Sequence, residues 1–157
     1  MQNPYVSAPE GVDETAWAAA VAKIRGYCGW HIAPEVTETV TLDGSGGPVI
    51  VLPTLQLNDV ESITDDGREV VDPEWSRSGI VRRYCWTRKL RGVVAEITHG
   101  YEEWPADLEA VTIEIASIVS PAGVSQVNSG THQISFRESL PVQALETLER
   151  YKLPFVQ

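Results

Sequence analysis

The sequence has few of the residues from which metal, nucleic-acid and membrane sites are built. It holds two cysteines, three histidines, and 12 lysines and arginines against 22 acids in 157 residues. No CxxC or HxxxH pair occurs, so no zinc site is expected. A net charge of −10 disfavours binding through nucleic-acid phosphates. No apolar run approaches the roughly 18 residues of a membrane span. We therefore expect no metal site and no membrane span.

The N-terminus indicates a cytosolic protein. The first residues, MQNPYVSAPEGVDE, contain neither a basic nor an apolar region, which argues against a signal peptide. In a reducing cytosol, Cys28 and Cys85 are expected to be buried thiols and not a disulfide. The length and an apolar fraction of 43 % predict one soluble domain with a fair core.

Hydrophobic periodicity separates helical from extended segments. Helical spacing predicts a helix after Asp13, with a stop at Gly29 and a buried stripe of Trp17, Ala20, Val21, Ile24 and Cys28. The chain from 36 to 101 alternates and is rich in β-branched residues, which predicts about six short strands and a hairpin turn at Asp66-Gly67. Helical spacing returns after Pro105, with one face formed by Leu108, Val111, Ile115, Ile118 and Val119. A short helix is predicted after Pro141, with Val142, Leu145 and Leu148 apolar.

The expected fold class is therefore α+β. It comprises an N-terminal helix, a central antiparallel β-rich block of short strands, a second long helix, a short C-terminal helix and an extended tail. A single domain over 1–157 is expected to contain an extended arm at 1–12, a helix at 13–29, the β-rich block at 36–101, a helix at 105–120, and a C-terminal helix with a docking tail at 141–157.

The stretch THGYEEWP, residues 98–105, is the best candidate for chemistry. His99 with Glu102 or Glu103 would suit acid–base catalysis in a small hydrolase. Each residue also has a structural explanation, because a strand-end histidine satisfies backbone groups at a turn and acids favour the start of a helix. No GxSxG elbow accompanies the histidine. DGSGG, residues 43–47, lacks the lysine of a phosphate loop and is expected to be a flexible hairpin tip. We therefore expect no catalytic residue.

Two segments are candidates for partner binding. RRYCWTRKLRG, residues 82–92, is the one basic cluster, and it fits either a solvated hairpin or a contact with an acidic protein surface through Arg82, Arg83 and Arg88. The C-terminal segment combines basic and apolar residues that look exposed, and it either folds back on its own core or docks into a neighbour. The candidate docking residues are Tyr151, Lys152, Leu153, Pro154, Phe155 and Val156.

The order of these motifs resembles the head-to-tail connector (adaptor, head-completion) proteins of long-tailed bacteriophages. The resemblance rests on IRGYCGW at the end of the first helix, on PVIVLPTLQLNDVESITDDGREV, on WSRSGIVRRYCW, and on VVAEITHGYEEWPADLEAVTIEIAS. It covers about residues 10–120, and THGY followed by P and DL is its most specific part. Residues 121–157 match loosely.

The resemblance implies a structural virion protein without catalysis or cofactor. It implies a closed ring of about twelve copies below the portal protein, in the neck of the virion, assembled in the host cytoplasm. The ring would extend the DNA channel, let double-stranded DNA pass without sequence-specific binding, and meet a stopper or tail-completion protein. Twelve copies at −10 each would carry about −120, which suits a channel that does not hold DNA. The alternative is a small β-rich binding module without catalysis.

Overall fold

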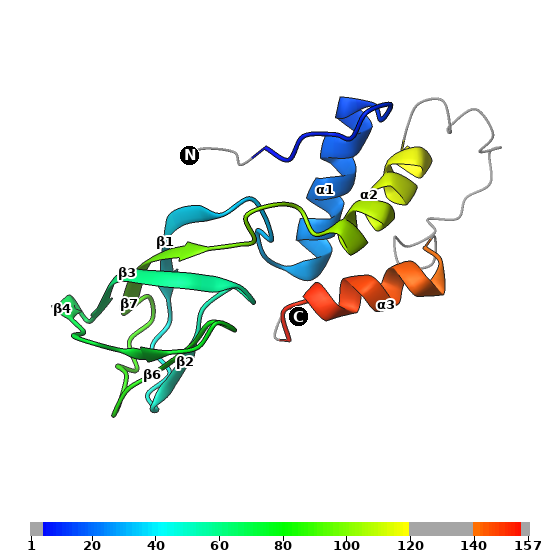
Figure 1. The fold of residues 1–157 in the computed structure, drawn as a ribbon. Helices are drawn as coiled ribbons and strands as arrows, with labels where there is room; N and C mark the ends of the chain where they lie inside the picture. The colour runs from blue at the N-terminus through cyan, green and yellow to red at the C-terminus, as the bar shows by residue number, and fades with distance from the viewer. Residues whose placement is uncertain (1–4, 120–139, 155–157) are drawn as a thin grey trace. The chain divides into compact units, whose positions relative to one another are not determined.

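The computed structural model describes residues 5–119 and 140–154. These residues form three helices and seven strands, in the order helix, strands, two helices, so the predicted α+β class is confirmed (Figure 1). They divide into two compact units, which we name the helical unit, from residues 1–30 and 104–157, and the sheet unit, residues 31–103. The expectation that the chain is one connector domain stays a prediction.

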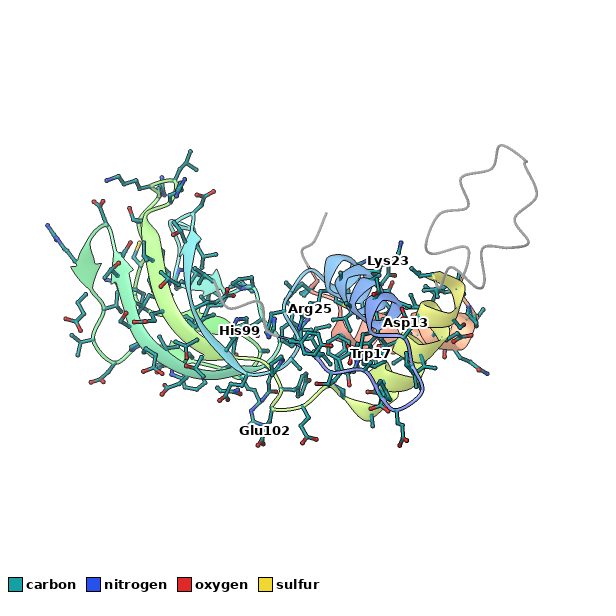
Figure 2. The ribbon with its side chains drawn as sticks, turned by 90° about the horizontal axis from the view of Figure 1, so that it is seen from above. Asp13, Trp17, Lys23, Arg25, His99 and Glu102 are labelled. Atoms are coloured by element: carbon teal, nitrogen blue, oxygen red, sulfur yellow. The ribbon has the colours of Figure 1, made fainter. Side chains whose placement is uncertain are left out.

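Helix α1, Glu14–Cys28, is bounded by residues that satisfy its free backbone groups. The Asp13 side chain accepts a hydrogen bond of 2.8 Å from the backbone N–H of Ala16. At the other end Gly29 takes the left-handed conformation, with φ 84°, and donates to the Arg25 carbonyl. Figure 2 labels Asp13, which precedes this helix, and Trp17 within it. The predicted stripe is buried, with Trp17 1 % exposed, and the predicted N-terminal helix is confirmed.

Helices α2, Ala106–Val119, and α3, Val142–Tyr151, complete the helical unit. Leu108 and Ile115 of α2 are buried as predicted, but Ile118 is 48 % exposed. On α3, Leu148 is buried whereas Val142, which was expected to share its apolar face, is 71 % exposed. The apolar faces of both helices are therefore narrower than periodicity predicts.

Seven strands form the sheet unit, one more than expected. They are β1 (Val36–Leu42), β2 (Val49–Val51), β3 (Leu57–Asp65), β4 (Arg68–Glu69), β5 (Glu74–Trp75), β6 (Ile80–Arg82) and β7 (Val93–His99). A four-stranded sheet has the order β1-β7-β3-β4 and a three-stranded sheet the order β2-β6-β5, and all pairs are antiparallel. The predicted hairpin turn joins β3 to β4, with φ 50° at Asp66 and 77° at Gly67.

Strand β7 organises the core of the sheet unit because it pairs with both β1 and β3. Its side chains alternate, so that Val93, Ala95, Ile97 and His99 are buried. The first three of these join Ile50, Leu52 and Val81 from the three-stranded sheet and its flank in one apolar cluster. The two sheets therefore pack on one shared core, and the other face of the four-stranded sheet is left to solvent.

Candidate interaction surfaces

His99 is a buried residue whose partner is another side chain. It is 1 % exposed, and its Nε2 lies 2.9 Å from Oε1 of Glu38 on the neighbouring strand β1. This differs from the expected bonding to backbone groups at the turn. Its Nδ1 has no hydrogen-bond partner among the described residues, and its ring meets that of His31 edge-on, with centroids 5.9 Å apart. Burial lowers the pKa of His99 and so favours the neutral imidazole. Glu38 opposes this shift, because its hydrogen bond and charge raise the pKa.

The two acids of THGYEEWP do not complete a catalytic group around His99. Glu102 and Glu103 are exposed in the loop after β7, and Figure 2 shows Glu102 pointing outward. Trp104, beyond them, donates from Nε1 to the Thr112 hydroxyl at 3.0 Å, inside the helical unit. Within residues 5–119 and 140–154, no group of three or more His, Cys, Asp or Glu side chains could hold a metal ion. The stretch forms a strand end and the lead into α2.

The end of strand β7 requires a glycine at position 100. Its φ is 103°, and an added Cβ would lie 3.0 Å from the Pro34 carbonyl oxygen and 3.1 Å from that of Ile32. The next residue, Tyr101, donates its N–H to the Ile32 carbonyl at 2.7 Å. The entry and exit of the sheet unit are therefore bound together at THGY.

The basic segment 82–92, for which the sequence allows a solvated hairpin or a partner contact, does not form a hairpin of its own. It begins as β6 and continues as an irregular chain that buries Trp86 in the core of the sheet unit. Arg83 binds Asp65 at 2.8 Å and lies over the Trp86 ring at 5.1 Å, so it is committed within the unit. Arg82 is exposed on β6, and Arg88 is exposed further along. Of the three arginines predicted to bind a partner, Arg82 and Arg88 are therefore exposed, whereas Arg83 is engaged within the sheet unit.

Arg88 belongs to a smaller surface at one end of the sheet unit. We name as the basic tip the exposed residues Arg68, Arg88, Lys89, Leu90 and Arg91. Leu90 is 76 % exposed between these cations. Lys89 binds Asp66 at 2.6 Å, which connects the turn at 87–92 to the β3–β4 turn.

The loop at 43–47 supports the basic tip and is not a flexible hairpin tip. Gly44 donates to the Lys89 carbonyl at 3.0 Å, and Gly46 donates to the Thr87 carbonyl at 2.9 Å. A Cβ on Gly44 would lie 2.0 Å from the Thr87 carbonyl oxygen. The glycines are there because two backbones approach closely, which the sequence alone does not reveal.

Sequence reasoning missed a second surface on the outer side of the four-stranded sheet. We name it the acidic face, and the outward positions of its three main strands are Thr37, Thr39, Thr41, Asp59, Glu61, Ser62, Thr64, Val94, Glu96 and Thr98. These residues include three carboxylates and no lysine or arginine. Its hydroxyls interact across strands: Thr37 and Thr98 lie 2.8 Å apart, and Thr98 donates to Glu61 at 3.0 Å. The alternation of threonines in VTETVTL was the signal that could have identified this face.

A groove of about 710 Å³ lies between the segment after β4 and the end of β6. Arg82, Arg83 and the fully exposed Tyr84 line one side of it, and Val71 and Pro73 lie on the other. Glu69, Asp72 and Glu74 also line it. The groove is open and mixed in charge.

The C-terminal segment is partly folded into the helical unit. Leu153 is 9 % exposed and donates its N–H to the Cys28 carbonyl at 2.9 Å, so its expected exposure is wrong. The Tyr151 hydroxyl donates to Asp107 at 2.8 Å, and the Lys152 ammonium lies 4.9 Å from the centre of the Tyr27 ring. Pro154 is exposed. Phe155 and Val156 lie outside the described residues.

The two cysteines differ in environment. Both are free thiols, and Cys28 is buried as expected. Burial, assisted by the charge of Glu149, raises the pKa of Cys28 to about 12, so its thiol stays protonated at neutral pH. Cys85 is exposed, which corrects the expectation for that residue.

In the described part of the chain, no helix is long and apolar enough to span a bilayer.

The fold is similar to chains in solved structures of particle necks. One similar chain is in the neck of a native GTA (gene transfer agent) particle computed with C12 symmetry. The match covers 91 % of this chain and 82 % of that chain, with a TM-score of 0.58 and 17 % identity. A chain in the neck of an empty GTA particle computed with C6 symmetry matches 91 % over 78 %, with a TM-score of 0.57 and 16 % identity. A chain in the virion of a native GTA particle matches 91 % over 77 %, with a TM-score of 0.55 and 17 % identity.

No protein-family model and no curated protein matches this chain in sequence. At 16–17 % identity the structural similarities show a shared fold. The resemblance to connector proteins noted in the sequence motifs is thereby confirmed at the level of the fold.

Proposed function

We propose that this chain is a structural, non-catalytic protein of the neck of a phage-like particle. The observation that carries the proposal is the fold shared over 91 % of the chain with a neck chain of a particle computed with C12 symmetry. The sequence motifs of connectors support the same function from a separate line of argument. The exposed Glu102 and Glu103, with His99 bound to Glu38, remove the support for a hydrolase.

In this function the chain forms a closed ring of about twelve copies. The ring sits below the portal protein, is joined beneath by a stopper or tail-completion protein, and surrounds double-stranded DNA without reading its sequence. Its net charge of −10 per chain disfavours retention of DNA in the channel. The protein would be assembled in the host cytoplasm and remain in the virion neck.

The C-terminal segment remains the proposed contact with the portal protein. Tyr151, Lys152 and Leu153 are anchored on the helical unit, so they position the residues that follow them. Pro154, Phe155 and Val156 would then reach the portal. Arg82, which is exposed on β6, is proposed as a further partner contact, together with Arg88.

The test mixes the full chain with the portal protein of its own genome and measures native mass and negative-stain images. We expect a ring stacked on the portal. A chain that ends at Pro154 removes residues 155–157 and leaves the buried Leu153 in place. It should keep the ring and lose the stacking. The Glu146→Gln variant, at an exposed position of α3 outside residues 151–157, serves as the control.

A binding module without catalysis is the second candidate, because the groove of about 710 Å³ offers apolar and charged groups to an extended ligand. A chain that stays monomeric and ignores the portal protein would contradict the neck function. Binding of peptides at Tyr84 by such a monomer would favour the module.

A further inference from the structure

The basic tip is a preorganised surface. Arg91 holds a left-handed backbone, with φ 53°, and its N–H donates to Asp43 at 2.7 Å. Gly92 donates to the Lys89 carbonyl at 3.1 Å and closes the turn around Leu90. Strained backbone of this kind persists only where surrounding contacts fix it, and it clusters at functional sites. The turn therefore displays Leu90 in one conformation, without a large entropy cost on binding.

The charges of the basic tip are directed outward on an acidic chain. Lys89 is paired with Asp66, whereas Arg88 and Arg91 are exposed beside Leu90. The carbon stem of Arg88 covers Gly46, where a Cβ would lie 2.5 Å from Cγ. The tip thus offers an apolar centre flanked by cations, which fits an acidic surface with an apolar spot.

The acidic face of the same unit has the complementary composition. Asp59, Glu61 and Glu96 supply negative charge, and Val94, 37 % exposed, supplies an apolar spot on the central strand β7. Thr98, bonded to Glu61, fixes one of the carboxylates. The face is a regular sheet surface, so it too is rigid before binding.

A cyclic ring needs two different surfaces on each copy, because neighbours in a ring meet head to tail. The basic tip and the acidic face are two such surfaces on one compact unit, with opposite charge. We propose that the basic tip of one copy docks on the acidic face of the next copy, with Leu90 on Val94, and that this contact joins neighbours in the ring. The inference rests on the proposed neck function and identifies the contact that closes its ring.

The test reverses the charge of one surface at a time in the full chain. The tip variant combines Arg88→Glu with Arg91→Asp, since aspartate tolerates left-handed backbone better than most residues. The face variant combines Glu61→Lys with Glu96→Lys. Native mass and negative-stain images measure the ring, and circular dichroism verifies that each variant folds.

Two matched controls reverse charge on exposed residues of the same unit outside both surfaces. They are Arg77→Glu, in the β5–β6 turn, and Glu102→Lys, in the loop after β7. We expect both controls to form the ring and each surface variant to remain monomeric. The contact should also weaken as salt rises, because exposed charges are screened.

Mixing gives the sharpest result. An equal mixture of the two surface variants retains one working tip on one chain and one working face on the other. We expect the two variants to alternate in one ring, because the reversed tip of one variant also complements the reversed face of the other. A chain that carries both reversals should regain the ring, because its tip and face are again complementary.

Rings formed by the tip variant alone and by the face variant alone would overturn the tip-to-face contact and leave the neck function standing. Rings that persist while the tip variant loses the portal protein or DNA would assign the tip to that partner and also overturn the inference. A wild-type chain that forms no ring, with or without the portal protein, would overturn the neck function together with this contact.

Discussion

The helical unit and the sheet unit differ in which part of the chain holds them together. In the helical unit, side chains reach across to backbone groups: the Trp17 indole donates to the Val6 carbonyl at 2.8 Å, and the Trp30 indole donates to that of Tyr151 at 2.6 Å. In the sheet unit, backbone pairs with backbone, even in the loops at 43–47 and 87–92. The helical unit should therefore be most sensitive to truncation of large buried side chains. The sheet unit should be most sensitive to the addition of a side chain at a glycine where two backbones meet.

Truncation of Trp17 should give the largest effect. Trp17 is 1 % exposed on α1, so the Trp17→Ala variant leaves a cavity and should lose about 3–5 kcal/mol of stability. Urea unfolding followed by circular dichroism measures the loss. Trp17→Phe keeps most of the volume and should lose less. Equal losses for the two variants would show that packing at this position matters little.

Addition of one methyl group to Gly44 tests the sheet unit. A Cβ there meets the Thr87 carbonyl at 2.0 Å, so Gly44→Ala must separate two bonded backbones and should lose about 1–3 kcal/mol. Gly26 is the matched control because it lies inside α1 with no atom within 4 Å of an added Cβ. Gly26→Ala should gain about 0.5–1 kcal/mol in the same urea experiment. Stability changes of opposite sign in the two variants would sharpen the contrast between the units, and changes of the same sign would remove it.

Removal of the α1 cap should have a smaller effect that is confined to the helical unit. Asp13→Ala leaves the Ala16 N–H without its acceptor and should lose about 1 kcal/mol. Hydrogen exchange at the first turn of α1 measures the change locally. Asp13→Asn retains an acceptor and should restore most of the protection. Faster exchange throughout β7 in the alanine variant would argue against separate stabilisation of the units.

The smallest effect concerns pH and the sheet unit. Burial lowers the pKa of His99 below its ordinary value of about 6.5, so the unfolded chain binds the proton more readily than the folded chain. Stability from this group is complete above about pH 6.5 and is lost as the pH falls toward the folded pKa. In urea unfolding at pH 7 and at pH 5, the His99→Gln variant should show a smaller difference in unfolding free energy between the two pH values than the wild type. Glu38→Gln should show a larger difference, because Glu38 opposes the lowering of the His99 pKa. The same difference as in the wild type for both variants would refute this.

Helices were easier to predict from the sequence than strands. The stripe on α1 and its stop at Gly29 depend on residues close in sequence, and the structure agrees at each point. The acidic face and the basic tip depend on pairings between distant residues, such as Thr37 with Thr98 and Gly44 with Lys89. Local patterns carry no information about which loops will meet. Leu153 was misjudged for the same reason, since its burial depends on α1, more than a hundred residues earlier.

The sheet unit is inserted in the sequence of the helical unit, so the two halves of the helical unit are synthesised at different times. Helix α1 leaves the ribosome first, but α2 and α3 follow only after residues 31–103. At about 5–20 residues per second, that gap lasts on the order of 4–15 s, which is long compared with the folding of a small domain. The sheet unit is contiguous, and the bond between Tyr101 and Ile32 closes it. It can therefore finish folding while Trp17 and Ile24 still wait for their partners, a stage at which the nascent chain is most in need of a chaperone.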